Sequence, residues 1–292
     1  MQHDIDSAAL FAPAVLTVRA GAALEMMIFA VMIRSRGFCA RLIVAPGLRC
    51  AYSGLRPLPA IDRSLEAVMT DEEKDQFERN FAAAKEIMQR LSQNLPEFIE
   101  VAAIGVRSKA PYQLLAVRAA LIWRTEELAR NACNSLECDD LAVAAILTRS
   151  ITENAALTWK LKDILERRVG KSPEELNTAL MRALAGSTTW EEGPAPYNVL
   201  SCLDTLTKTI DGARQTYESL SEFAHPNWRG VMGLYSKTDR EKFITYFGHN
   251  LGGAPAKCQI TTALCAALGI FEYAYKAITE AMPRWISELE PL

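Results

Sequence analysis

Histidine is scarce in this chain, and lysine is absent from its first 68 residues. Only His3, His225 and His249 carry an imidazole among 292 residues, and they show no local spacing typical of metal ligands. The seven cysteines include no CxxC pair and are odd in number, a pattern typical of a reducing compartment. Residues 170–172 end like a phosphate-binding loop but lack its first glycine. We therefore expect a cytoplasmic protein without a metal ion or a cofactor.

A strong net charge is also lacking, since 35 acidic residues nearly balance 32 basic ones and leave a formal charge of −3. This balance argues against a broad electrostatic surface for nucleic acid, although a local basic patch remains compatible with it. Half of the residues are hydrophobic and 23% are charged. Such a composition is typical of a soluble globular protein with one large or two modest domains.

Signals for secretion or membrane insertion are weak. Asp4 and Asp6 stand where a signal peptide requires basic residues. The apolar run Ala20–Ile33 is too short to span a bilayer and contains Glu25. Leu141–Trp159 is long enough but carries two charged and several polar side chains. We expect it to be a buried core helix, and we expect no membrane partner.

Residues 1–68 differ in composition from the rest. All of their basic residues are arginine, and the segment Arg34–Pro59 shows neither helical nor strand periodicity. One interpretation is upstream sequence translated from a mis-assigned start, with Met69 as the native first residue. The other is a loosely packed N-terminal extension in which Ala20–Ile33 forms one helix. Mass spectrometry of the N-terminal peptide from the natural host distinguishes the two.

From residue 69 to 292 the pattern predicts a single all-helical domain. Apolar residues recur every three or four positions, as on the buried face of a helix. The expected helices cover about 71–95, 111–133, 140–168, 172–184, 199–224, 239–247 and 256–281. No useful stretch alternates apolar and polar residues as a strand does. The predicted fold class is therefore all-α, a helical bundle.

Capping boxes mark three of the expected helix starts. Thr70 with Glu73, Ser172 with Glu175, and Thr238 with Glu241 have the spacing at which two side chains satisfy the first free amides of a helix. At the other end, His225 precedes a proline, and a residue in that position avoids the helical conformation. We expect the helix 199–224 to stop there.

Arg149 and Glu153 are the only charged residues in Leu141–Trp159 and lie one helical turn apart. Charge within an apolar helix costs free energy unless it is paired or used. In a functional interpretation, the guanidinium orients a carboxylate or phosphate in a cleft, and Glu153 positions it. In a structural interpretation, the pair only fixes the packing of the helix.

His225 is the only histidine at an expected helix end. On a helix it follows the line of Arg214, Glu218 and Ser221, with Glu222 nearby. Carboxylates and a helix C-terminus favour the protonated imidazole, which suits general acid–base chemistry. A histidine that only caps the last carbonyls is the alternative. Arg229 follows closely and adds a second guanidinium.

Two short motifs resemble a known group of proteins. Arg149-Ser-Ile-Thr-Glu153 and Tyr217-Glu-Ser-Leu-Ser221-Glu-Phe-Ala-His225 look like the R-S-x-x-E and Y-x-x-L-S-x-x-x-H helices of an uncharacterised bacterial all-helical family similar to HEPN domains. The resemblance covers roughly residues 110–280. It implies a core of four or five helices with extra helices around it, a homodimer, and RNA or a cognate protein as partner. Many HEPN domains are metal-independent ribonucleases of stress and phage-defence systems.

The resemblance implies catalytic roles for His225, Arg149 and Glu153, supported by the nearby polar residues Tyr217, Ser221, Glu222 and Arg229. The HEPN signature separates an arginine from the histidine by four to six intervening residues, but residues 218–220, where that arginine would lie, are Glu-Ser-Leu. Arg149 or Arg229 would have to replace it. One hypothesis is therefore an effector that cleaves RNA, with His225 as general acid or base and Arg149 stabilising the phosphorane. The other is a catalytically silent interaction or dimerisation module.

Overall fold

Residues 69–167, 172–249 and 251–290 are described by the computed structural model. This part of the chain is predominantly helical, as the sequence predicts. The N-terminal segment 1–68, with its two interpretations and its expected helix at Ala20–Ile33, lies outside the described residues. So does most of the rejected phosphate loop at 170–172.

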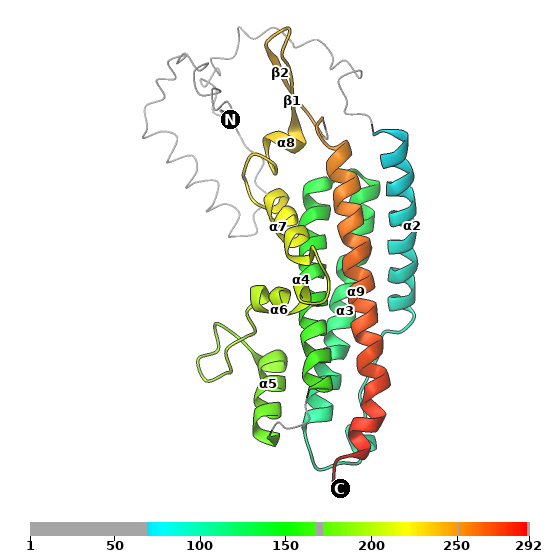
Figure 1. Ribbon diagram of the computed structural model, residues 1–292, viewed down its shortest axis with the longest axis vertical. Coiled ribbons are helices and arrows are strands. Elements are labelled where there is room, and N and C mark those ends of the chain that lie inside the picture. The colour runs from blue at the N-terminus through cyan, green and yellow to red at the C-terminus, as the bar shows by residue number, and fades with distance from the viewer. Residues whose placement is uncertain (1–68, 168–171, 250, 291–292) are drawn as a thin grey trace, which may run out of the picture. The chain divides into compact units, whose positions relative to one another are not determined.

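Four long helices form the core: α2 (Asp71–Ser92), α3 (Ala110–Glu137), α4 (Leu141–Glu166) and α9 (Ala254–Ser287). α9 packs against α2, α3 and α4, although it follows them by about a hundred residues or more, and the four lie side by side in Figure 1. Each contributes side chains with little or no exposure: Ala84, Leu114, Ile122, Leu136, Ile151, Leu161, Leu165, Leu264, Phe271 and Ile278. The regular apolar spacing of the sequence is therefore the buried face of this bundle.

Two of the three expected capping boxes start helices. At α2 the Glu73 amide donates to Thr70 Oγ1 over 3.2 Å, and the Thr70 amide donates to Glu73 Oε2 over 2.9 Å. Ser172 and Glu175 form the same pair of bonds at the start of α5 (Pro173–Ala185). Both boxes satisfy amides that have no partner within the helix.

The prediction of one helix over 199–224 is wrong, because the chain breaks there into α6 (Val199–Thr207) and α7 (Ala213–Ala224). Gly212, just before α7, has a φ of +78°, a left-handed conformation that glycine adopts without a steric penalty. The break lets both short helices bury apolar side chains in one cluster with Trp159 of α4. Periodicity continued across the break, so the sequence pattern did not reveal it.

The helix predicted at 239–247 is also wrong. The segment forms an antiparallel hairpin of β1 (Ser236–Asp239) and β2 (Ile244–Phe247), with Thr238 opposite Thr245. The Asp239 carboxylate accepts from the amides of Glu241 and Lys242, both over 3.0 Å, and so closes a turn. A short polar side chain before a free amide serves a turn as well as a helix start. The β-branched and aromatic residues of Ile244–Phe247 favour the strand.

Two short helices complete the described part: η2 (Ala102–Ile104) and α8 (Met232–Tyr235). α9 was predicted over 256–281 but continues to Ser287 past Pro283. The hairpin projects beyond the end of the bundle at which α9 begins (Figure 1). The structure thus agrees with the predicted class and adds one small sheet to it.

Among the described residues, α9 alone is long and apolar enough to cross a membrane by length and composition. Half of its most apolar stretch is buried inside the structure, as in the core helix of a soluble protein. A single helix of this kind is weak evidence for either environment. The expected absence of a membrane partner and the cytoplasmic location stay predictions.

Candidate functional site

Arg149 and Glu153 meet two residues of α7, and the four form a closed network. Arg149 donates from Nε to Ser221 Oγ over 3.0 Å and from Nη2 to the Tyr217 hydroxyl. The Tyr217 hydroxyl donates to Glu153 Oε1 over 3.0 Å, which also lies 3.2 Å from Arg149 Nη2. We call these four residues the Arg149 network. It joins the two sequence motifs on which the resemblance rests.

The Arg149 network is half-buried, since 30% of the Arg149 side chain and 24% of the Glu153 side chain are exposed. Burial raises the pKa of Tyr217, and the Glu153 carboxylate raises it further. The phenol therefore stays protonated at neutral pH and donates to Glu153. The guanidinium carbon lies 4.8 Å from the Tyr217 ring centre, and this contact adds a cation–π attraction.

His225 is not part of this network. The residue ends α7, where its backbone amide donates to the Ser221 carbonyl over 3.0 Å. Its side chain is exposed and makes no hydrogen bond or ion pair with a described residue. The structure therefore shows neither the predicted acid–base contact nor a side-chain cap on the last carbonyls.

The other residues on the predicted line also have different partners. Arg214 binds Asp204 and Glu218, both over 2.8 Å, at the surface. The Glu222 carboxylate accepts from Asn227 Nδ2 over 2.7 Å. These contacts connect α7 to its neighbours in sequence and do not connect it to Arg149.

Arg229 lies on the α9 side of α7. It donates to Ser219 Oγ over 3.1 Å and to Gln259 Oε1 over 3.2 Å, and it stacks on the Phe223 ring at 4.9 Å. No contact joins it to Arg149 or His225 among the described residues. Of the predicted site residues, the structure therefore brings together Arg149, Glu153, Tyr217 and Ser221, and it leaves out His225, Glu222 and Arg229.

A second polar cluster, which was not predicted from the sequence, lies between α2, α3 and α9. Arg90 forms two hydrogen bonds to the Glu272 carboxylate, over 2.8 and 2.9 Å, and Lys276 donates to the same carboxylate over 2.9 Å. Arg118 lies in the same cavity, which we call the Arg118 cavity, with a volume of about 410 Å³. One signal was available: Arg118 is the only charge in Leu114–Trp123.

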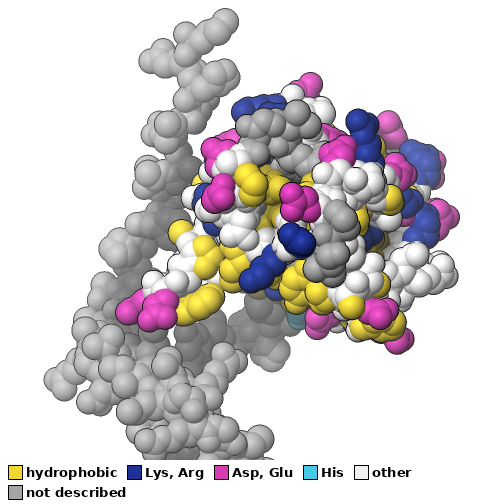
Figure 2. Space-filling view, turned by 90° about the horizontal axis from the view of Figure 1, so that it is seen from below, with side chains coloured by type: hydrophobic (Ala, Val, Ile, Leu, Met, Phe, Trp, Pro, Cys, Tyr) yellow, Lys and Arg dark blue, Asp and Glu magenta, His cyan; other side chains and the backbone are white. Residues whose placement is uncertain are grey.

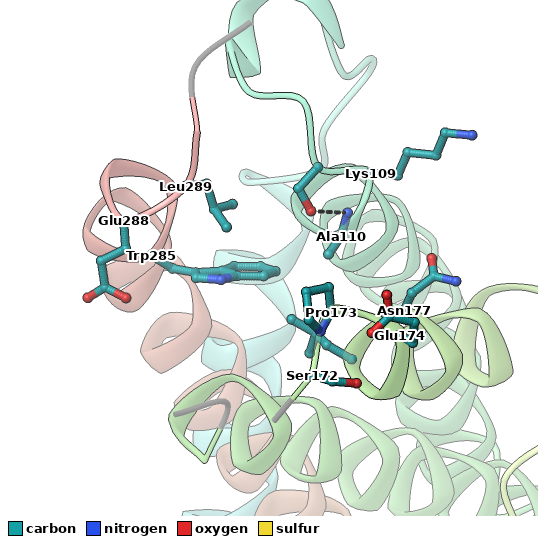
Figure 3. Close-up of a pocket in the computed structure, with 11 residues that line it drawn as sticks. Lys109, Ala110, Ser172, Pro173, Glu174, Asn177, Trp285, Glu288 and Leu289 are labelled. Atoms are coloured by element: carbon teal, nitrogen blue, oxygen red, sulfur yellow. Dashed lines mark hydrogen bonds between the residues drawn. The ribbon is translucent and has the colours of Figure 1, made fainter. Parts of the chain in front are cut away.

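A larger cavity of about 620 Å³ lies where α3, α5 and α9 meet. Figure 3 shows the Trp285 indole facing Pro173, with Glu174 and Asn177 at the side and Lys109 pointing away. The cavity therefore offers an apolar floor and polar groups at its rim, without a basic side chain directed into it. Its lining does not favour a particular ligand over water.

The described part of the chain offers neither a cluster of metal ligands nor, on the face in Figure 2, a basic surface. No group of three or more His, Cys, Asp or Glu side chains among the described residues could hold a metal ion. On the face shown in Figure 2, the described basic and acidic side chains are interspersed. Burial raises the pKa of the Cys133 thiol to about 11, so this cysteine stays protonated and unreactive.

Comparisons with models of protein families, with curated proteins and with solved structures find no match for this chain. The likeness to HEPN domains therefore stays a prediction that rests on the Arg149–Glu153 and Tyr217–His225 segments.

Proposed function

We propose that this chain is a catalytically silent helical module that forms a homodimer through the region of its hairpin. The observation that carries the proposal is a group of seven large apolar side chains, all exposed, between residues 228 and 247. We call it the hairpin surface: Trp228, Val231, Met232, Tyr235, Phe243, Ile244 and Phe247. Phe243 is 85% exposed and Trp228 is 73% exposed. Exposed apolar groups of this extent are typical of interaction sites.

The hairpin also has backbone amides and carbonyls at its edges that a second strand could pair with. In a sheet of two strands, each strand has one edge whose amides and carbonyls have no ladder partner, and an isolated hairpin is only marginally stable. β1 carries Lys237 and Asp239, charges that oppose edge pairing, whereas Ile244–Phe247 in β2 has none. We therefore expect β2 to pair with β2 of a second copy about a two-fold axis, which satisfies both edges at once.

The oligomeric state of the full chain tests this proposal. We expect a dimer by analytical ultracentrifugation and a monomer for Phe247→Lys, because the charge enters the interface twice. Loss of the Phe247 contact in both copies should raise the dissociation constant of the dimer by about a hundredfold or more. Phe98→Lys, at an exposed apolar residue outside the hairpin surface, is the matched control and should stay dimeric. A monomeric wild type, or a dimer unaffected by Phe247→Lys, refutes the proposal.

RNA cleavage is the second candidate, and one observation favours it. The His225 imidazole is exposed and lies one turn after Ser221, and neither it nor Arg149 Nη1 has a hydrogen-bond partner among the described residues. In this reaction the 2′-oxygen attacks the adjacent phosphorus while His225 takes its proton, the bond from phosphorus to the 5′-oxygen breaks, and the leaving 5′-oxygen takes a proton from solvent. Arg149 stabilises the negative charge on the phosphorane oxygens. An RNA strand would have to bring its phosphate between the two side chains.

Induced expression in a bacterial host separates the two candidates. Wild type and His225→Ala are compared for growth and for the integrity of total RNA. The dimerisation module predicts normal growth and intact RNA for both. Growth arrest with RNA fragmentation in the wild type alone would establish the ribonuclease and refute the silent module.

A further inference from the structure

The Arg118 cavity is lined by side chains of α2 and α3 and by side chains of α9, which is far from both in the sequence. Arg90 and Leu91 come from the last turn of α2 and Asn94 from just beyond it, Arg118 and Ile122 come from α3, and the remainder from α9. The cavity volume of about 410 Å³ lies within the range of small-molecule sites. Its lining combines basic groups with apolar ones: Arg90, Arg118 and Lys276 with Leu91, Ile122 and Tyr275.

Arg118 is the unusual member of this lining. Its Nη2 donates to Thr279 Oγ1, and its guanidinium carbon lies 3.7 Å from the Tyr275 ring centre. Its Nε is buried and has no hydrogen-bond partner. No described carboxylate lies within ion-pair distance of it. Arg118 is thus a partly buried cation without a counterion, and such a charge costs free energy unless a ligand compensates it.

The carboxylates of the cavity do not compensate Arg118. Glu272 is fully engaged by Arg90 and Lys276, and the Arg90 guanidinium holds the pKa of its carboxyl down at about 2. Glu280, the other acidic residue of the lining, is exposed and makes no ion pair with a described residue. The positive charge of Arg118 therefore remains available to a molecule that enters the cavity.

We propose that the Arg118 cavity binds a small organic acid, a monocarboxylate with a compact apolar body. The carboxylate accepts hydrogen bonds from the guanidinium of Arg118 and from the Lys276 ammonium. The apolar body lies against Leu91, Ile122 and the Tyr275 ring. Arginine provides planar donors that match a carboxylate, and the Tyr275 ring fixes the plane of the guanidinium.

The charge balance of the lining selects a monoanion. Three cations and two carboxylates leave an excess of one positive charge. A monocarboxylate neutralises it, whereas a dianionic phosphate monoester brings a second negative charge close to Glu272. The apolar wall gives no hydrogen bond to the further oxygens of a phosphate. Both features favour the carboxylate.

Calorimetric titration of the full chain with benzoate tests the site. We expect one benzoate per chain, and we expect Arg118→Gln to weaken binding by about tenfold or more, because a charged hydrogen bond is lost. Arg79→Gln removes the same charge from an exposed position on α2, three turns from Arg90, and should bind as the wild type does. Benzyl alcohol, with the same apolar body and no charge, should not bind.

Three results would overturn the proposal. These are an absence of benzoate binding to the wild type, equal binding by Arg118→Gln, and binding of inorganic phosphate in place of benzoate. Thermal unfolding of the unliganded variants is the control for folding, and each should unfold in a cooperative transition. Arg118→Lys sharpens the test, because it keeps the charge and loses the planar donors. It should bind benzoate more weakly than the wild type does.

Discussion

Arg149 and Arg118 lie on neighbouring core helices in similar apolar surroundings, yet their contacts differ. Arg149 has a carboxylate one turn further along α4 and two hydroxyl groups from α7. Arg118 has a hydroxyl and an aromatic ring from α9 and no carboxylate. The first charge is satisfied within the protein and fixes how two helices pack. The second is left uncompensated, which is the feature expected of a binding residue.

The largest expected effect comes from breaking the Arg149 network. Arg149→Ala removes two hydrogen bonds to α7 and leaves the partly buried Glu153 without its cation. We expect the free energy of unfolding to fall by about 2 kcal/mol, measured by urea denaturation. Arg79→Ala, at an exposed arginine of α2, should change it by less than about 0.5 kcal/mol. If both variants change the free energy of unfolding equally, the Arg149 network does not stabilise the fold.

A smaller effect is expected on acidification, at Glu272, whose carboxylate pairs with Arg90 and not with Arg118. The pKa of Glu272 is lowered from 4.5 to about 2. Its contribution to stability is complete above pH 4.5 and is lost as the pH falls from there towards 2. We expect about 1 kcal/mol, since Arg90 and Lys276 are solvent-screened. Urea denaturation at several pH values should show a flatter acid limb for Glu272→Gln than for Glu280→Gln.

The smallest effect is expected at Arg118 itself, in contrast to Arg149. Arg118→Met loses the bond to Thr279 and the contact with the Tyr275 ring, but it also removes a partly buried charge. We expect these terms to offset each other within about 0.5 kcal/mol in the free energy of unfolding. A loss as large as that of Arg149→Ala would make Arg118 a structural residue and would weaken the case for a ligand.

The same comparison explains what the sequence could reveal. Arg149 and Glu153 lie at positions i and i+4, so their pairing follows from helix geometry alone. Thr70 and Ser172 capped helices as predicted because both partners of a capping box are local. Arg90 and Glu272 are 182 residues apart, and nothing in either segment identifies the other. Local chemistry was therefore predictable, and contacts between helices were not.

The two wrong helix predictions, over 239–247 and 199–224, have local causes. Asp239 completes a turn with the same backbone bonds that would start a helix, and the strand that follows decides the outcome. The helix breaks before Gly212 although the apolar spacing continues across the break. His225 was correctly predicted at a helix end, but the direction of its side chain depends on tertiary packing, which helix spacing does not specify.

The position of α9 in the sequence has a consequence for how the chain folds during synthesis. α2, α3 and α4 all leave the ribosome before α9, the helix that packs against each of them. Until it emerges, the apolar faces of α2 and α4 that it covers remain open to solvent and to other nascent chains. The bundle therefore closes only after α9 has been synthesised, and chaperones that bind exposed apolar segments can act on α2 and α4 until then.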